Sequence, residues 1–233
     1  MKRKVSILIL FLCLTLFHPL HGSTISKVVF TTPERNIIAG VRNWLDYGAT
    51  NYVMTVQLQD DSGNPVPSTE TVILMISGTS PQDDFSPDTV NWNVNTITIS
   101  SGSSQGSFYY YDEITGVHTI TVDETPDKGW AAATQDVTVY PNDAYAFRLE
   151  HDGTATVYVA EDVTVSALDQ FENICTGHPP LDKPYAPSDE WIYYVGIASF
   201  TTTGTARVNP LSYDFNEAVN AAVSYTHLTL PTN

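Results

Sequence analysis

The amino-acid sequence predicts an all-β chain made of two β-sandwiches in tandem, the second of them truncated. Two observations carry this prediction: a motif that recurs at a fixed spacing, and a series of short strand-like segments separated by turn residues. The recurring residues, 109 positions apart, are Thr55 and Thr164, Val56 and Val165, Asp60 and Asp169, and Asn64 and Asn173. That spacing is about one sandwich domain, and repetition at a fixed pitch is typical of an array of modules.

Strand signals fill the first repeat. Asn51–Gln59 alternates apolar and polar side chains, and the turn Asp60–Pro65 follows, in which Gly63 accepts positive φ and Pro65 interrupts the ladder. Further strands are predicted at 28–31, 36–38, 71–76, 96–100, 107–111, 116–122 and 133–140. No stretch shows a sustained helical period with caps. About seven or eight short strands in roughly 115 residues is the count of an immunoglobulin-like sandwich.

A second start follows the short Pro-containing segment 141–143, which predicts a semi-rigid rod rather than loosely tethered beads. Its strands are predicted at 145–149, 156–159, 163–168, 192–201 and 206–208, and counterparts of 107–140 are absent. The predicted divisions are a signal peptide at 1–22, a complete sandwich at 23–142, an incomplete one at 143–222 and an artefactual tail at 223–233.

The chain start predicts export. Three basic residues precede an uncharged apolar run from Val5 to Phe17, which is shorter than the roughly 20 residues that cross a bilayer, so we expect a cleaved signal ending at Gly22 and no membrane span afterwards. The mature chain then holds seven Lys and Arg against 26 Asp and Glu. Such a field repels nucleic acid. Cys175 is the one cysteine left, which excludes an internal disulfide and favours a small buried apolar side chain.

The search for reactive groups predicts no catalytic, cofactor-binding or metal-ligating residue, and therefore no enzyme. Gly102–Gly106 matches the letters of the serine-hydrolase pattern G-x-S-x-G, but no helix follows it, and we expect a hairpin loop there. Paired acids supply too few oxygens for calcium unless loops of two modules meet. The junction around Asn142 and Asp143 is the place where such a Ca²⁺ site is expected, if one exists.

A run of aromatic residues offers a surface for sugar. Strand alternation sends Phe108 and Tyr110 to one face and Tyr109 and Tyr111 to the other. If the second face is exposed, Tyr109 and Tyr111 are candidates for stacking on sugar rings; the alternative is ordinary strand tyrosines.

The segment V-Q-L-Q-D-D-S-G-N-P-V at 56–66 and its echo V-S-A-L-D-Q-F-E-N-I-C at 165–175 resemble bacterial immunoglobulin-like repeats of the invasin and intimin type. The resemblance covers most of residues 26–222. It implies that the turn residues are structural and that the modules act as spacers; those residues are Asp60, Gly63, Asn64, Asp169 and Asn173. Glu172 departs from the pattern at the place of Gly63, and a left-handed backbone there costs about 1 kcal/mol relative to glycine.

Residues 223–232 resemble the translation of a transposon-end sequencing adapter. This resemblance implies that natural sequence stops near Ala222 and that further domains are encoded downstream.

Two functions follow as hypotheses. The leading one is a non-enzymatic structural or adhesive region of an exported, extracellular or cell-surface protein that presents a unit for an unknown protein or glycan ligand. The alternative makes these modules carbohydrate-binding accessories of a truncated, secreted polysaccharide-degrading enzyme.

Overall fold

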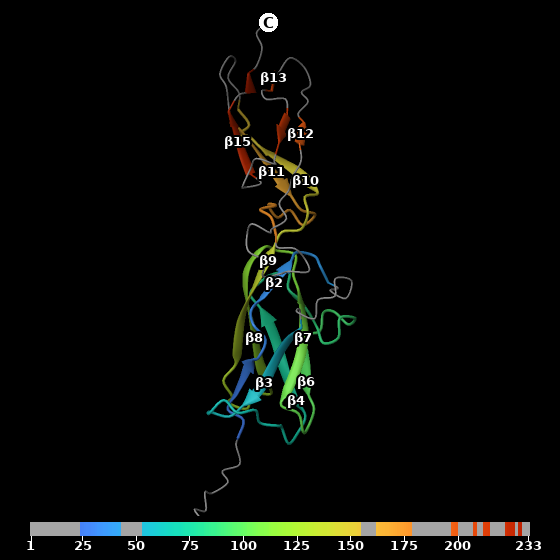
Figure 1. Cartoon of the computed structure of the whole chain (residues 1–233), viewed down its shortest axis with the longest axis vertical. Coiled ribbons are helices and arrows are strands. Elements are labelled where there is room, and N and C mark those ends of the chain that lie inside the picture. The colour runs from blue at the N-terminus through green and yellow to red at the C-terminus, as the bar shows by residue number, and fades with distance from the viewer. Residues whose placement is uncertain are drawn as a thin grey trace, which may run out of the picture.

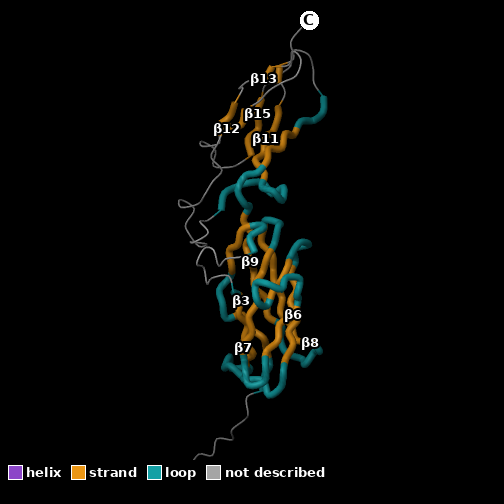
Figure 2. Tube along the Cα trace, turned by 90° about the vertical axis from the view of Figure 1, so that its right-hand side faces the viewer, coloured by secondary structure: helices purple, strands orange, loops and turns teal. Residues whose placement is uncertain are grey.

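A computed structural model describes residues 24–42, 53–154 and 162–178, together with the backbones of five short strands further along the chain. The described residues form strands and loops and contain no helix (Figure 2). No segment among them is a helix long and apolar enough to cross a membrane. The predicted all-β class is therefore confirmed. The signal segment 1–22 and the strand expected at 156–159 lie outside the described residues.

Nine strands of the first half form two sheets (Figure 1). The four-stranded sheet has the order β1 (Lys27–Phe30), β3 (Met54–Gln59), β7 (Gln105–Tyr111) and β5 (Asp84–Ser86). The five-stranded sheet has the order β2 (Arg35–Ile38), β9 (Ala133–Tyr140), β8 (Gly116–Thr125), β4 (Val72–Gly78) and β6 (Thr96–Ile99). Within these sheets the neighbours pair antiparallel, except that β2 runs parallel to β9.

Alternation along the strands builds one apolar core between these sheets. On β3 the buried positions are Met54, Val56 and Leu58, and the residues between them are half-buried. The facing sheet contributes Leu74 and Ile76 from β4, with further apolar residues from β8 and β9, to the same cluster. Because one core joins two stacked sheets, this half of the chain is an immunoglobulin-like β-sandwich, as the sequence predicts.

Two connections differ from the prediction. The long segment between β4 and β6 contains a short strand, β5, which pairs with the end of β7 through Asp84 and Tyr111. The loop at 102–106 was expected to close a hairpin, and that expectation is wrong, because β6 and β7 belong to different sheets. The loop carries the chain across the end of the sandwich and has no nucleophile-elbow geometry, since no helix follows it.

The second half contains smaller sheets. One has the order β10 (Ala146–Glu150), β11 (Asp162–Leu168) and β15 (Ala222–Thr226). Two further pairs are β12 (Ile197–Ser199) with β14 (Ser212–Asp214), and β13 (Arg207–Val208) with β16 (Leu228–Thr229). Apart from Ala222, the residues of β15 and β16 belong to the stretch that resembles the adapter. The origin of that stretch and the domain limits stay predictions.

The core predicts a sharp mutational response at Phe108. This side chain is fully buried, and its ring meets Phe30 and Phe85 edge to face, each 6.2 Å away between ring centres. Phe108→Ala should lower the free energy of unfolding by roughly 3–5 kcal/mol, because it loses apolar burial and leaves a cavity. Urea denaturation followed by circular dichroism measures this. Thr98→Ala, on the outer face of β6, is the control and should stay within about 0.5 kcal/mol; similar effects of both changes would contradict the core assignment.

Candidate functional site: the junction between the two halves

The first copy of the repeated motif forms a closed turn. The Asn64 N–H donates to Asp60 Oδ1 at 2.8 Å, and the Asp60 N–H donates back to the Asn64 carbonyl at 3.0 Å. Gly63 has φ of +83° and donates its N–H to the Asp60 carbonyl at 3.0 Å. Asp60 is half-buried, and its hydrogen bonds with Asn64 lower the pKa of its carboxyl below the ordinary value.

The second copy repeats this geometry bond for bond. The Asn173 N–H donates to Asp169 Oδ1 and the Asp169 N–H to the Asn173 carbonyl, each at 2.9 Å. Glu172 takes the place of Gly63 and has φ of +69°, so the left-handed backbone is kept at a strain of about 1 kcal/mol. The sequence repeat is thus a repeat of local structure, with the same turn geometry in both copies.

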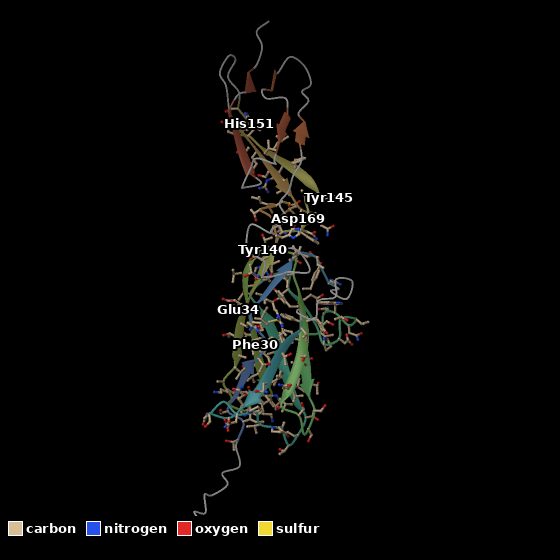
Figure 3. All side chains as sticks on the ribbon, in the orientation of Figure 1. Phe30, Glu34, Tyr140, Tyr145, His151 and Asp169 are labelled. Atoms are coloured by element: carbon tan, nitrogen blue, oxygen red, sulfur yellow. The ribbon has the colours of Figure 1, made fainter. Side chains whose placement is uncertain are left out.

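The two turns differ in what surrounds them. Asp169 is 2% exposed and lies between the two halves, between Tyr140 and Tyr145 (Figure 3). Asn173 extends the turn to the first sandwich: its Nδ2 donates to the Glu113 carbonyl at 2.8 Å, and its Oδ1 accepts the Thr115 N–H at 3.1 Å. Asn64 makes side-chain hydrogen bonds only to Asp60 among the described residues.

The linker residue Asn142 bonds to both sides of the junction. Its Nδ2 donates to the Ala39 carbonyl of the first sandwich at 2.9 Å, and its N–H donates to Asp169 Oδ2 at 3.0 Å. The Cys175 thiol also points at the Asn142 carbonyl, at 3.5 Å. One residue of the connection is therefore fixed from both directions, which removes the freedom that a tether would have.

An apolar contact completes the junction. The Phe171 ring packs against the apolar core of the first sandwich, and a Cβ placed on Gly40 would overlap that ring. Gly40 has φ of +77°, so both the backbone and the close approach of Phe171 favour glycine there. Beyond the junction a separate small cluster of Ala167 and Cys175 begins, with Ala144 against it. The cores are distinct, and Phe171 is a side chain of the second half that packs against the first core.

The expected calcium site has no convergent ligands here. Asp143 is exposed, and its carboxylate lies 3.5 Å from His178 Nε2. Asp169 is surrounded by N–H donors from Phe171, Asn142 and Asn173. Across the described ranges no three His, Cys, Asp or Glu side chains gather as a metal site. Calcium at the junction stays a prediction from sequence.

Cys175 is placed as the sequence suggests. It is 3% exposed, and burial, together with the nearby Asp169 and Asp143, raises the pKa of its thiol to about 12. It is a packing residue of the second cluster rather than a nucleophile.

The tyrosine face differs from the expected sugar platform. Tyr109 is half-buried, but Tyr111 is only 6% exposed. The Arg42 guanidinium lies 4.3 Å from the Tyr111 ring centre, and the Trp92 ring meets the same ring at 5.9 Å. Burial and a hydrogen bond to Glu113 raise the pKa of Tyr111 to about 12. A sugar cannot stack on a ring that these side chains already cover.

Comparison with known proteins finds similarity to several solved structures, all at low sequence identity. No family model matches the chain, and no curated protein matches it. Among solved structures it is similar to domains 5–6 of the S-layer protein SbsC, at 13% identity, 91% coverage of this chain, 100% of that chain and a TM-score of 0.35. The Yersinia pseudotuberculosis adhesin InvE matches at 15% identity over 90% of this chain and 53% of that one, with a TM-score of 0.34.

A beta-glycosidase from Bacteroides vulgatus matches at 16% identity over 51% of this chain and 14% of that enzyme, with a TM-score of 0.35. The chain likewise spans 53% of the structure of SbsC domains 4 and 5. At such identities and TM-scores the fold assignment depends on the strand topology described above. The activities of these proteins are not assigned to this chain.

The sequence did not single out Phe171 and Gly40. A signal for the first was present, because Phe171 stands where the first copy has Ser62, so a large apolar side chain interrupts an otherwise polar turn. Gly40 carries no comparable signal, since its partner is far away in the chain.

The two asparagines allow a matched test of the junction. Asn173→Ala loses the side-chain bonds to Asp169, Glu113 and Thr115, whereas Asn64→Ala loses only the side-chain bonds to Asp60. Both variants keep the backbone bonds of the turn. We expect Asn173→Ala to cost about 1 kcal/mol more than Asn64→Ala, because the half-buried Glu113 carbonyl and Thr115 N–H lose their partner. Urea denaturation of each single variant measures the difference. Equal costs would mean that Asn173 does not stabilise the junction.

Cys175 reports folding of the second half. Ellman's reagent at pH 8 should react with it far more slowly in the native chain than in urea, because burial hides the thiol and its raised pKa leaves little thiolate. Rates with the protein beginning at Ser23 avoid interference from Cys13. Equal native and denatured rates would show that the cluster around Cys175 is open.

Proposed function

We propose that this chain is a non-enzymatic, immunoglobulin-like region of an exported surface or secreted protein, and that it holds a partner-binding unit at a fixed distance and angle. The observation that carries the proposal is the junction, in which the motif turn, the linker and an aromatic ring together join two separate cores. If the two halves only had to stay attached to each other, a flexible linker would be sufficient.

Charge and layout support the same role. The chain has a formal net charge of −16. A high charge of one sign keeps a protein soluble and opposes its association with other copies, which suits an extended surface molecule. Export and the cell-surface location are proposed from the apolar N-terminal segment. The resemblance of the repeated turn to invasin-type modules supports a spacer or presenting role.

The carbohydrate-binding alternative loses the surface that it was expected to use, because Tyr111 is covered by Arg42 and Trp92. Tyr109 and Tyr111 are therefore not proposed as a sugar-binding surface.

Small-angle X-ray scattering on the protein beginning at Ser23 tests the role. We expect an elongated particle, with the two halves one after the other as in Figure 1. Its maximum dimension should not change when EDTA is added, since the Asp169 carboxylate accepts hydrogen bonds from amide N–H groups. The double variant Phe171→Ala with Asn173→Ala should broaden the distance distribution, and Asn64→Ala should not. A compact globule, or a double variant indistinguishable from the parent, would contradict a stiff spacer. A shorter particle in EDTA would support the predicted calcium site at the junction.

A further inference from the structure

A polar pocket of about 340 Å³ opens on the side of the first sandwich where β6 stops pairing with β4. Its volume falls in the range of roughly 300–1,000 Å³ that small-molecule sites occupy. The ladder between these strands ends at Met75 and Thr96, and the Ile76 N–H then donates to the Asn95 carbonyl at 2.7 Å. The polar lining comes from Ser77, Gly78, Asp83, Asp84, Asn93 and Asn95.

The walls of this pocket are fixed by hydrogen bonds. Asp84 Oδ1 accepts the N–H groups of Phe85 at 2.9 Å and Asn93 at 2.5 Å, and the Val94 N–H donates to the Phe85 carbonyl at 3.1 Å. Asn93 is held at φ of +63°, a conformation that side-chain-bearing residues rarely adopt. The backbone that carries the lining side chains is therefore held in place, and a ligand would not have to order a loop.

The lining offers hydrogen-bond donors and acceptors together. The side-chain amides of Asn93 and Asn95 make no hydrogen bond within the described part of the chain, and each presents an NH₂ group and a carbonyl oxygen. The Asp83 carboxylate adds an acceptor, and Ser77 adds a hydroxyl. The apolar floor, Ile76 and Phe85, is almost fully buried. A complementary ligand therefore carries several hydroxyl groups that donate and accept at once.

The charges in the pocket favour a neutral ligand over a cation. Arg42 Nη2 already lies 3.4 Å from Asp84 Oδ2 and offsets that carboxylate. Burial, and then the nearby Asp112, raises the pKa of the Asp83 carboxyl above its ordinary value. The pocket brings together two carboxylates, and among the described residues no set of three metal-ligating side chains is found.

We propose that this pocket binds one neutral pyranose unit of a glycan, through Asp83, Asn93 and Asn95. The ring hydroxyls donate to the Asp83 carboxylate and to the amide oxygens, and they accept from the amide NH₂ groups. This binding activity goes beyond the spacer role and is independent of the junction, since the pocket and the junction share no residue.

An array of immobilised neutral oligosaccharides, probed with the protein beginning at Ser23, identifies the saccharide. Calorimetric titration with that saccharide then compares three variants. Asn95→Ala and Asp83→Asn should each weaken binding roughly tenfold or more, because each removes a hydrogen-bonding group of the pocket. Asp61→Asn is the control; it makes the same charge change as Asp83→Asn in an exposed turn at a different site and should leave affinity unchanged.

Folding of the variants is separable from binding. Asp83→Asn removes a charge that burial disfavours, and Asn95→Ala keeps the carbonyl that holds Ile76, so both should melt within a few degrees of the parent. Absence of saccharide binding, or binding that the two pocket variants leave unchanged, would overturn the proposal. So would calcium chloride binding that Asp83→Asn abolishes in the absence of any saccharide binding, because the pocket would then be a metal site.

Discussion

The buried carboxylate of Asp169 is the constraint on which the junction depends. A carboxylate that is 2% exposed is costly unless its oxygens accept hydrogen bonds, and here Oδ1 accepts the N–H groups of Phe171 and Asn173, while Oδ2 accepts Asn142 N–H and Asn173 Nδ2. Those donors belong to the turn and to the linker. The hydrogen bonds to the Asp169 carboxylate therefore fix the turn, the position of the linker and the orientation of the Asn173 side-chain amide. The other hydrogen bonds of that amide go to the first sandwich.

The same turn has a different role in each copy of the motif. In the first copy it closes a strand connection at the surface, and Asp60 and Asn64 satisfy each other. In the second copy the turn keeps its shape, while Phe171 in place of Ser62 adds an apolar contact to the core behind Gly40. Two features thus convert a local motif into an inter-module contact: the aromatic substitution and the neighbouring loop at 113–115. The strain at Glu172 is small beside the burial that Phe171 gains.

The strands were predictable because alternation and turn chemistry are local. Met54–Gln59 and the Asp60 turn follow from neighbours in the sequence. The contacts of the junction were not predictable from the sequence, because Thr115 and Asn173 are 58 positions apart and no periodic pattern indicates that they meet. The cover over Tyr111 was missed for a related reason: alternation places Tyr109 and Tyr111 on one face, but it does not show that Arg42, from another loop, lies over one of them. The parallel pairing of β2 with β9 is likewise a long-range outcome.

The chemistry of the junction suits a strongly acidic chain. The contacts described between its two halves join amides, carbonyl groups and an aromatic ring, and none of them is an ion pair. Ionic screening therefore has little to act on at the junction, whereas an orientation set by surface ion pairs would vary with salt. Electrostatic repulsion between the two acidic halves also favours an extended chain, because it opposes folding of one half back onto the other. The absence of an ion pair among these contacts and the like charge of the two halves both favour one extended arrangement.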